Sequence, residues 1–86
     1  MTLAEQLTAA LKVLQNVESA TKGSRTTDPV EVLMEGLGES KKRARGILWE
    51  NLKAMGLCGR RRGGYWVSES VTNVTDEMVN ELFGSK

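Results

Sequence analysis

The chain has 86 residues, of which 40% are hydrophobic and 27% are charged, a composition typical of one small globular domain rather than of a disordered segment. It has no histidine and a single cysteine, Cys58, which excludes an intramolecular disulfide, a zinc finger and catalysis that depends on histidine. The sequence lacks both a run of about 18 apolar residues and a basic N-terminus followed by an apolar stretch, so it predicts neither membrane insertion nor secretion. We therefore expect a cytoplasmic protein.

The charge is unevenly distributed, although the formal total is only +1. Eight of the twelve basic residues lie between positions 41 and 62, together with one of the eleven acidic residues, Glu50. This window carries +7 (eight minus one), and the rest of the chain carries −6 (four minus ten). A local concentration of positive charge attracts phosphates and gains free energy by releasing their counterions, which predicts a polyanionic partner. The alternative is a solvated helix face followed by an arginine-rich loop.

An amphipathic helix is predicted over about residues 2–20, within an N-terminal region 1–21. Its apolar residues recur at steps of three and four, which places them on one face. They are Leu3, Leu7, Ala10, Leu11, Leu14 and Val17. The polar stretch 21–27 contains Gly23, which can end the helix, and its composition indicates a surface loop.

A helix-turn-helix is predicted over residues 28–57. Its first helix begins sharply, because Asp28 is a good N-cap, Pro29 suits the first helical position and Glu31 favours the positive end of the helix dipole. The buried face of this helix is expected to consist of Val30, Leu33, Met34 and Leu37.

Gly36 and Gly38 then predict a tight turn, since glycine adopts positive φ at little steric cost. The next helix should run from about residue 41 to 55, with Ser40 as its N-cap and Gly56 as its stop. At 100° per residue its apolar face consists of Ala44, Ile47, Leu48, Leu52 and Met55, with Trp49 at the margin. The outward face consists of Lys42, Arg43, Gly46, Glu50 and Lys53. Basic residues at a helix N-terminus oppose the dipole, so a partner explains them better than folding does.

A basic β-hairpin is predicted over residues 57–68. Three arginines lie between the glycines of 59–64, and the following Tyr65, Trp66 and Val67 favour a strand. If Tyr65 and Val67 face the core, Trp66 faces outward, where an indole can stack on a sugar or lie along a phosphate backbone. The alternative is that Trp66 covers the edge of the core.

A short amphipathic helix is predicted over residues 75–84. Thr75, Asp76 and Glu77 favour its N-terminus. Its apolar residues are Met78, Val79, Leu82 and Phe83. The chain should therefore be mainly α with a small β-hairpin.

The order of helix, helix, tight turn, helix, glycine and basic hairpin resembles the winged helix-turn-helix family of DNA-binding domains. The resemblance covers about residues 28–68. It is carried by Leu37-Gly38-Glu39-Ser40 as the turn, by residues 52–57 leading into the wing, and by residues 60–67 as the wing. It implies a single winged helix domain over residues 1–86, with a three-helix core, a basic wing and a short C-terminal helix.

Within that family, Ala44-Arg45, the arginine-glycine wing and Tyr65-Trp66 look most like small transcriptional regulators of the bacterial fimbrial-operon or phage type. Arg45 departs from the pattern, because counting back from Leu52 places it where such domains commonly bury an aliphatic residue. The third helix is therefore expected to be rotated or one residue longer than usual, and base contacts are fixed only to within one position.

The resemblance implies sequence-specific binding to double-stranded DNA, with the third helix in the major groove and the wing on the backbone or in the minor groove. Lys42 and Arg43 are the candidates for reading bases, and Gly46 would allow close approach. Phosphate binding is expected of Ser40, Lys41 and Arg45. The wing supplies charge and minor-groove insertion through Arg60, Arg61 and Arg62, with Trp66 beside them.

Other functions are open. The same fold serves as a protein-interaction module, although protein interfaces usually lose charge. Single-stranded nucleic acid or RNA is a closer competitor, because Tyr65 and Trp66 could stack on bases. An enzyme is not expected: the glycine-rich stretch 59–64 lacks the features of a P-loop, and Cys58 is expected to be buried. No cofactor, metal or small-molecule ligand is predicted.

A homodimer through the terminal helices is also predicted. The apolar stripes Leu3 to Val17 and Met78 to Phe83 exceed what a three-helix core needs. Two linked half-sites would multiply the affinity for DNA. Alternatively, the two terminal helices pack against each other within one chain and enlarge a small core.

Overall fold

The computed structural model describes residues 2–17 and 24–83. In this part of the chain the elements are α1 (Leu3–Gln15), β1 (Ser24–Arg25), α2 (Pro29–Leu37), α3 (Lys41–Arg45), the π-helical segment η1 (Gly46–Leu52), β2 (Cys58–Arg61), β3 (Gly64–Val67) and α4 (Asp76–Phe83). The fold is mostly helical with a small antiparallel hairpin, as the sequence predicted.

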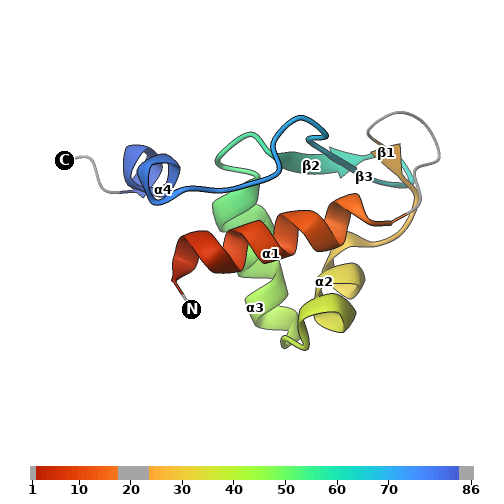
Figure 1. Cartoon of the computed structure of the whole chain (residues 1–86). Helices are drawn as coiled ribbons and strands as arrows, with labels where there is room; N and C mark the ends of the chain where they lie inside the picture. The colour runs from red at the N-terminus through yellow and green to blue at the C-terminus, as the bar shows by residue number, and fades with distance from the viewer. Residues whose placement is uncertain (1, 18–23, 84–86) are drawn as a thin grey trace.

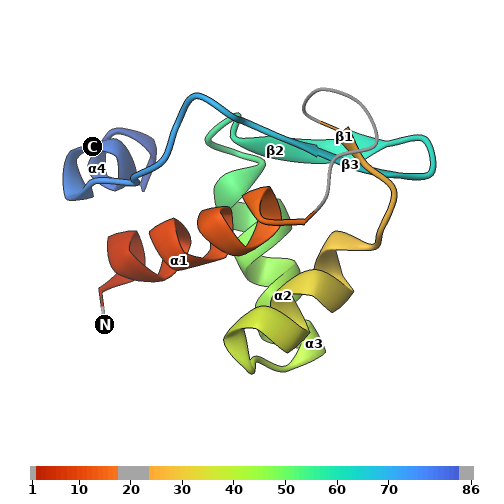
Figure 2. The same ribbon diagram turned by 45° about the vertical axis from the view of Figure 1, so that its right-hand side comes forward.

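The sheet lies along one side of the helices. Its order is β1-β3-β2, and both pairs of strands are antiparallel. In Figure 1 the sheet runs along the top, α1 crosses below it, and α2 and α3 lie beneath α1. The α4 helix lies at the left end, and Figure 2 shows the hairpin tip extending to the opposite end, past α2 and α3. The longest dimension of the molecule is 38 Å.

The core is formed where α1 meets α2, η1 and β3. Each leucine buried there contributes about 1.5–3 kcal/mol. The side chains with essentially no exposed surface include Leu7, Leu11, Leu14, Leu33, Leu48, Leu52 and Tyr65. The predicted apolar faces of the first three helices are thus confirmed in their central positions, and Met34, Leu37 and Met55 pack at the margin.

The first helix is shorter than predicted. It begins with a capping box, in which the Thr2 hydroxyl accepts from the Glu5 amide (3.2 Å) and the Glu5 carboxylate accepts from the Thr2 amide (2.8 Å). The bond from the Thr2 backbone amide lowers the pKa of Glu5. The helix ends at Gln15, so Val17 lies beyond it. Residues 18–20 and Gly23 of the prediction lie outside the described residues.

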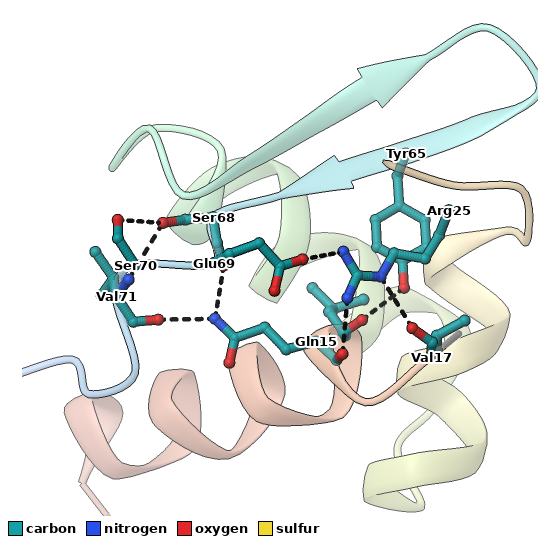
Figure 3. Close-up of polar contacts among 9 residues, drawn as sticks. Gln15, Val17, Arg25, Tyr65, Ser68, Glu69, Ser70 and Val71 are labelled. Carbon is teal, nitrogen blue, oxygen red and sulfur yellow. Dashed lines mark hydrogen bonds and ion pairs between the residues drawn. The ribbon is translucent and has the colours of Figure 1, made fainter. Parts of the chain in front are cut away.

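The early end of α1 is explained by Arg25, a residue expected in a surface loop but only 4% exposed. Its guanidinium donates to the carbonyl oxygens of Gln15 (2.7 Å) and Val17 (3.0 Å) and forms an ion pair with Glu69 (Figure 3). The side chain thus satisfies carbonyl groups at the end of the helix that have no helical partner. Arg25 also belongs to β1, which the sequence did not predict.

Three further bonds attach this end of α1 to β3 and to the segment that follows it. The Tyr65 hydroxyl donates to the Leu14 carbonyl oxygen (2.9 Å), and the Gln15 amide nitrogen donates to the carbonyl oxygens of Ser68 (2.6 Å) and Val71 (2.7 Å). Burial raises the pKa of Tyr65. The C-terminal end of α1, β1 and the segment after β3 therefore form one hydrogen-bonded unit, which we call the Arg25 cluster.

The turn between α2 and α3 has the geometry that the sequence predicted, with one correction. At the start of α2, the Asp28 carboxylate accepts a hydrogen bond from the Val30 amide (2.9 Å). At its end, in the turn, Gly38 has a φ of 69°. Gly36, however, lies within α2 and takes no part in the turn. A side chain there would collide with Val13 of α1, so Gly36 serves the close packing of these two helices.

The third helix begins as predicted but widens after one turn. Ser40 caps it by accepting from the Arg43 amide (3.3 Å). From Gly46 the hydrogen bonds span five residues, as in the bond from the Lys53 amide to the Leu48 carbonyl (2.7 Å). A π-helical turn accommodates additional residues per turn, so the helix is locally wider than the expected α-helix.

The α4 helix begins where predicted, with the Thr75 hydroxyl accepting from the Met78 amide (3.2 Å). It packs against α1, and Met78 and Val79 border the core. The apolar face of α1 is therefore buried within this chain. Among the described side chains of the two terminal helices, Leu3 (40%) and Leu82 (38%) are the exposed large hydrophobic ones.

Candidate nucleic-acid interface

The exposed surface of α3 and η1 carries most of the predicted contact residues. Lys41, Lys42, Arg43 and Arg45 are all exposed, and Gly46 is partly exposed. The Ser40 hydroxyl oxygen accepts a hydrogen bond from the Arg43 amide, so the hydroxyl can still donate a hydrogen bond to an anion. The helix thus presents four cationic side chains within its first five residues.

These cations lie on different flanks of the helix. Lys41 and Arg45 line a shallow depression with Trp49, and Arg60 of the hairpin and the first residues of α2 border the same depression. Arg43 lies on another flank, where it borders a second depression together with Leu3 and Gln6 of α1. The first flank therefore joins the helix to the hairpin, and the second joins it to α1.

A third depression lies along the helix between Lys41 and Glu50, and it shares Lys42, Gly46 and Glu50 with the depression that Arg43 borders. These three residues are spaced by four and form the central ridge. An ideal Cβ at Gly46 would meet no atom within 4 Å, so the ridge is open at this point. Glu50 gives the basic surface a negative charge, which repels phosphate but can accept a bond from the amino group of cytosine.

Arg43 forms one weak ion pair on the surface. Its Nε lies 3.6 Å from a carboxylate oxygen of Glu39, in an i,i+4 ion pair. Such exposed pairs contribute about 0–1 kcal/mol, so the contact orients Arg43 weakly and leaves its terminal amino groups free. No carboxylate of the described residues forms an ion pair with Lys41, Arg45 or Arg60.

The hairpin arginines are not equivalent. Arg60 pairs with Tyr65 across the hairpin, and Arg61 pairs with Gly64. Directly paired residues share a face and successive residues alternate, so Arg60 lies on the core side with Tyr65 and Arg61 lies on the opposite side. Arg62 lies in the connecting turn. The predicted basic hairpin is therefore present, but Arg60 and Arg61 lie on opposite faces of it.

Arg60 lies against the third helix. Its guanidinium carbon is 4.5 Å from the centre of the Trp49 ring, within the range of a cation–π contact. The Trp49 indole nitrogen is buried and donates to no group among the described residues. This stack is the direct link between the basic part of the helix and the hairpin.

Trp66 lies on the outer face of the hairpin, where the prediction from Tyr65 and Val67 placed it. Both of those residues are buried, and Trp66 is partly buried. Its indole covers Gly59 on the neighbouring strand, where any side chain would collide with it. Trp66 therefore contributes to the packing of the hairpin as well as to its surface, and it lies on the face opposite Arg60.

The sequence did not predict that Trp49 and Glu50 belong to this surface. Trp49 was placed at the margin of the buried face, and its spacing of four from Arg45 was the available signal. Glu50 was predicted to face outward but was given no role. The contact of Trp49 with Arg60 depends on the hairpin register, which the spacing of residues along the helix does not contain.

Cys58 is part of the core rather than of this surface. Burial raises the pKa of its thiol from 9.0 to about 11, so the reactive thiolate is disfavoured at neutral pH. In residues 2–17 and 24–83, no group of three or more histidine, cysteine or acidic side chains is placed to hold a metal ion.

In comparisons with known proteins, no family model, curated protein or solved structure matched this chain. Among the described helices, none is long and apolar enough to cross a membrane.

Proposed function

We propose that this chain is a winged helix-turn-helix domain that binds double-stranded DNA as a small transcriptional regulator. The third helix enters the major groove, and the β2–β3 hairpin lies on the backbone or in the adjoining minor groove. The order α1-β1-α2-α3-β2-β3 and the sheet order β1-β3-β2 support this assignment of the fold.

The observation that carries the proposal is the continuity of the basic surface. Lys41 and Arg45 of the helix border the same depression as Arg60 of the hairpin, and none of the three is paired with a described carboxylate. A single phosphate backbone could therefore follow the surface from the helix to the hairpin.

Single-stranded nucleic acid is less well supported, because the two predicted stacking residues, Tyr65 and Trp66, and also Trp49 are engaged in contacts within the chain. Tyr65 is completely buried and bonded to the Leu14 carbonyl. Trp66 lies over Gly59, and Trp49 lies under Arg60. Stacking on bases requires an open aromatic face, which Tyr65 lacks.

The test is a salt titration of binding to random duplex DNA, single-stranded DNA and duplex RNA of equal length. We expect a preference for duplex DNA and a steep decrease of affinity with salt, because each neutralised phosphate contributes about 0.9 to the logarithmic slope. Equal weak binding to all three would contradict the proposal and indicate nonspecific electrostatics.

The role of the hairpin is tested by replacing Arg60, Arg61 and Arg62 together with alanine. Binding should weaken on all sequences and the salt slope should fall, while the far-ultraviolet circular dichroism stays unchanged. An unchanged slope would exclude the hairpin from the contact surface.

We also propose that the chain forms a homodimer on DNA, but the surface that joins the two copies is smaller than the sequence suggested. Since α1 buries its apolar face within the chain, the proposed contact is the depression lined by Ala54, Met55, Met78, Glu81 and Leu82. Sedimentation equilibrium with a duplex of two half-sites should give two proteins per duplex. A mass near 9.4 kDa for the free chain, together with one protein per duplex, would contradict the dimer.

A further inference from the structure

The stack of Arg60 on Trp49 connects two separate elements of the proposed DNA-binding surface. Trp49 belongs to η1 and Arg60 to β2, and the guanidinium carbon lies 4.5 Å from the ring centre. A stacked guanidinium uses its face for the ring and keeps its edge N–H groups free to bind an anion. The contact therefore fixes Arg60 without consuming its hydrogen-bonding capacity.

Lys41 and Arg45 lie beside this stack. They precede Trp49 at spacings of four, which places the three residues on one flank, and all of them border one depression with Arg60. None of the three cations pairs with a carboxylate of the described residues. Asp28 also borders the depression, but its carboxylate accepts the Val30 amide at the start of α2. The result is a small concave surface bordered by three cations and by one carboxylate.

Arg61 provides an internal comparison. It has the same charge as Arg60 and is the next residue, but the pleat places it on the opposite face of the hairpin, paired with Gly64. No aromatic ring of the described residues stacks on it. Any difference between Arg60 and Arg61 in binding would therefore reflect their position rather than their charge.

We propose that Trp49 is a positioning residue that holds the Arg60 guanidinium beside Lys41 and Arg45, so that these three cations form a preformed site for one backbone phosphate of the bound duplex. The inference rests on the proposed DNA-binding function. Holding a long side chain in its bound position before binding saves about 0.5–1.5 kcal/mol of ordering, which corresponds to about two- to tenfold in affinity.

The stack itself is tested in the free protein by nuclear magnetic resonance. A ring at this distance should shift the side-chain protons of Arg60 upfield, and the shift should be smaller in Trp49→Phe and absent in Trp49→Leu. The protons of Arg61 serve as the control. Ordinary shifts for Arg60 in the wild-type protein would overturn the inference whatever the protein binds.

The role in binding is tested by a double-mutant cycle on a random duplex. In the wild-type background, Arg60→Ala should weaken binding about two- to tenfold more than Arg61→Ala. In the Trp49→Leu background this difference should disappear. Thermal unfolding checks that each variant is folded. If Trp49→Leu is not, Trp49→Phe replaces it, and there the difference should become smaller rather than disappear, because phenylalanine keeps an aromatic face.

The salt slope separates positioning from a general structural effect. Trp49→Phe and Trp49→Leu change no charge, yet each should lower the slope toward that of Arg60→Ala, about 0.9 below the wild type for one lost phosphate contact. Equal losses for Arg60→Ala and Arg61→Ala, or an unchanged slope in both Trp49 variants, would overturn this inference alone. A wild-type chain that binds no duplex would instead contradict the proposed function.

Discussion

The molecule uses arginine in two opposite ways. Arg25 is buried, and its donors are taken by Glu69 and by two carbonyl oxygens at the end of α1. Arg60, Arg61 and Arg62 are exposed and pair with no carboxylate of the described residues. The comparison shows that the number of arginines says little about a binding surface. An arginine whose guanidinium is bonded within the chain stabilises the fold, and one whose guanidinium has no such partner is available to a ligand.

The largest effect should come from replacing the saturated arginine. Arg25→Met removes the donors for the Gln15 and Val17 carbonyl oxygens, so we expect a loss of about 2–4 kcal/mol in the free energy of unfolding. This is a large part of the roughly 5–15 kcal/mol of a typical domain. Urea denaturation measures it, with Arg61→Met as the matched control, which should change stability by less than about 0.5 kcal/mol. Similar losses for both variants would remove the distinction.

Cys58 allows a measurement of how much stability the fold loses when an unpaired charge is placed in its interior. Burial raises its pKa from 9.0 to about 11, so the unfolded chain loses the thiol proton before the folded chain does. Stability is therefore fully present below pH 9 and falls as the pH rises through the folded pKa, by about 2–3 kcal/mol in total.

The control for this prediction is Cys58→Ala. Tyr65, whose pKa is also raised by burial, contributes a loss of the same sign in both proteins. The difference between the two stability curves above pH 9 therefore isolates the thiol. Curves that stay parallel through this range would show that the thiol ionises as freely in the folded chain as in the unfolded one.

Lys42 and Arg43 are the exposed basic residues that are candidates for reading bases, so their substitution tests whether they contact bases or phosphates. Each alanine substitution should cost about 1–3 kcal/mol on a preferred duplex, found by selection from random sequences, and should flatten the preference at one position. Lys53→Ala is the control, since Lys53 is exposed beyond η1. A uniform loss on all sequences would reassign the residue to phosphate binding.

The smallest effect is expected at Gly46, where stability and binding should change in opposite directions. Its backbone is helical (φ −63°, ψ −47°) and a methyl group there would meet no atom. Gly46→Ala should therefore stabilise the fold by about 0.4–1 kcal/mol. If the ridge lies close to a base pair, the same change should lower the affinity for duplex DNA. Unchanged affinity would show that DNA does not approach Gly46.

The elements with strong local signals could be predicted from the sequence. The caps at Asp28, Ser40 and Thr75 are local and begin their helices where expected, because each side chain satisfies amides a few residues away. The hairpin was also predicted, since glycines flank a strand-forming segment. The inward direction of Tyr65 and Val67 followed from the alternation of a strand.

The features that depend on distant contacts could not be predicted. β1 has only two residues, Ser24 and Arg25, too few for a pattern, and it exists by pairing with β3. The end of α1 depends on the same Arg25, whose buried position results from carbonyl groups eight and ten residues earlier. The stack between Trp49 and Arg60 joins two elements whose relative position only the fold provides.

The π-helical segment has a consequence for how this surface can change. Arg45 departed from the expected pattern, and the wide turn that follows it provides room for a residue that an α-helix would exclude. Removing one residue between Gly46 and Leu52 should therefore let the segment return to α-helical winding while the residues on either side keep nearly the same direction relative to the core. The wide turn thus lets the segment carry one more residue while Lys41, Lys42 and Arg43 keep the direction that they would have in a regular helix.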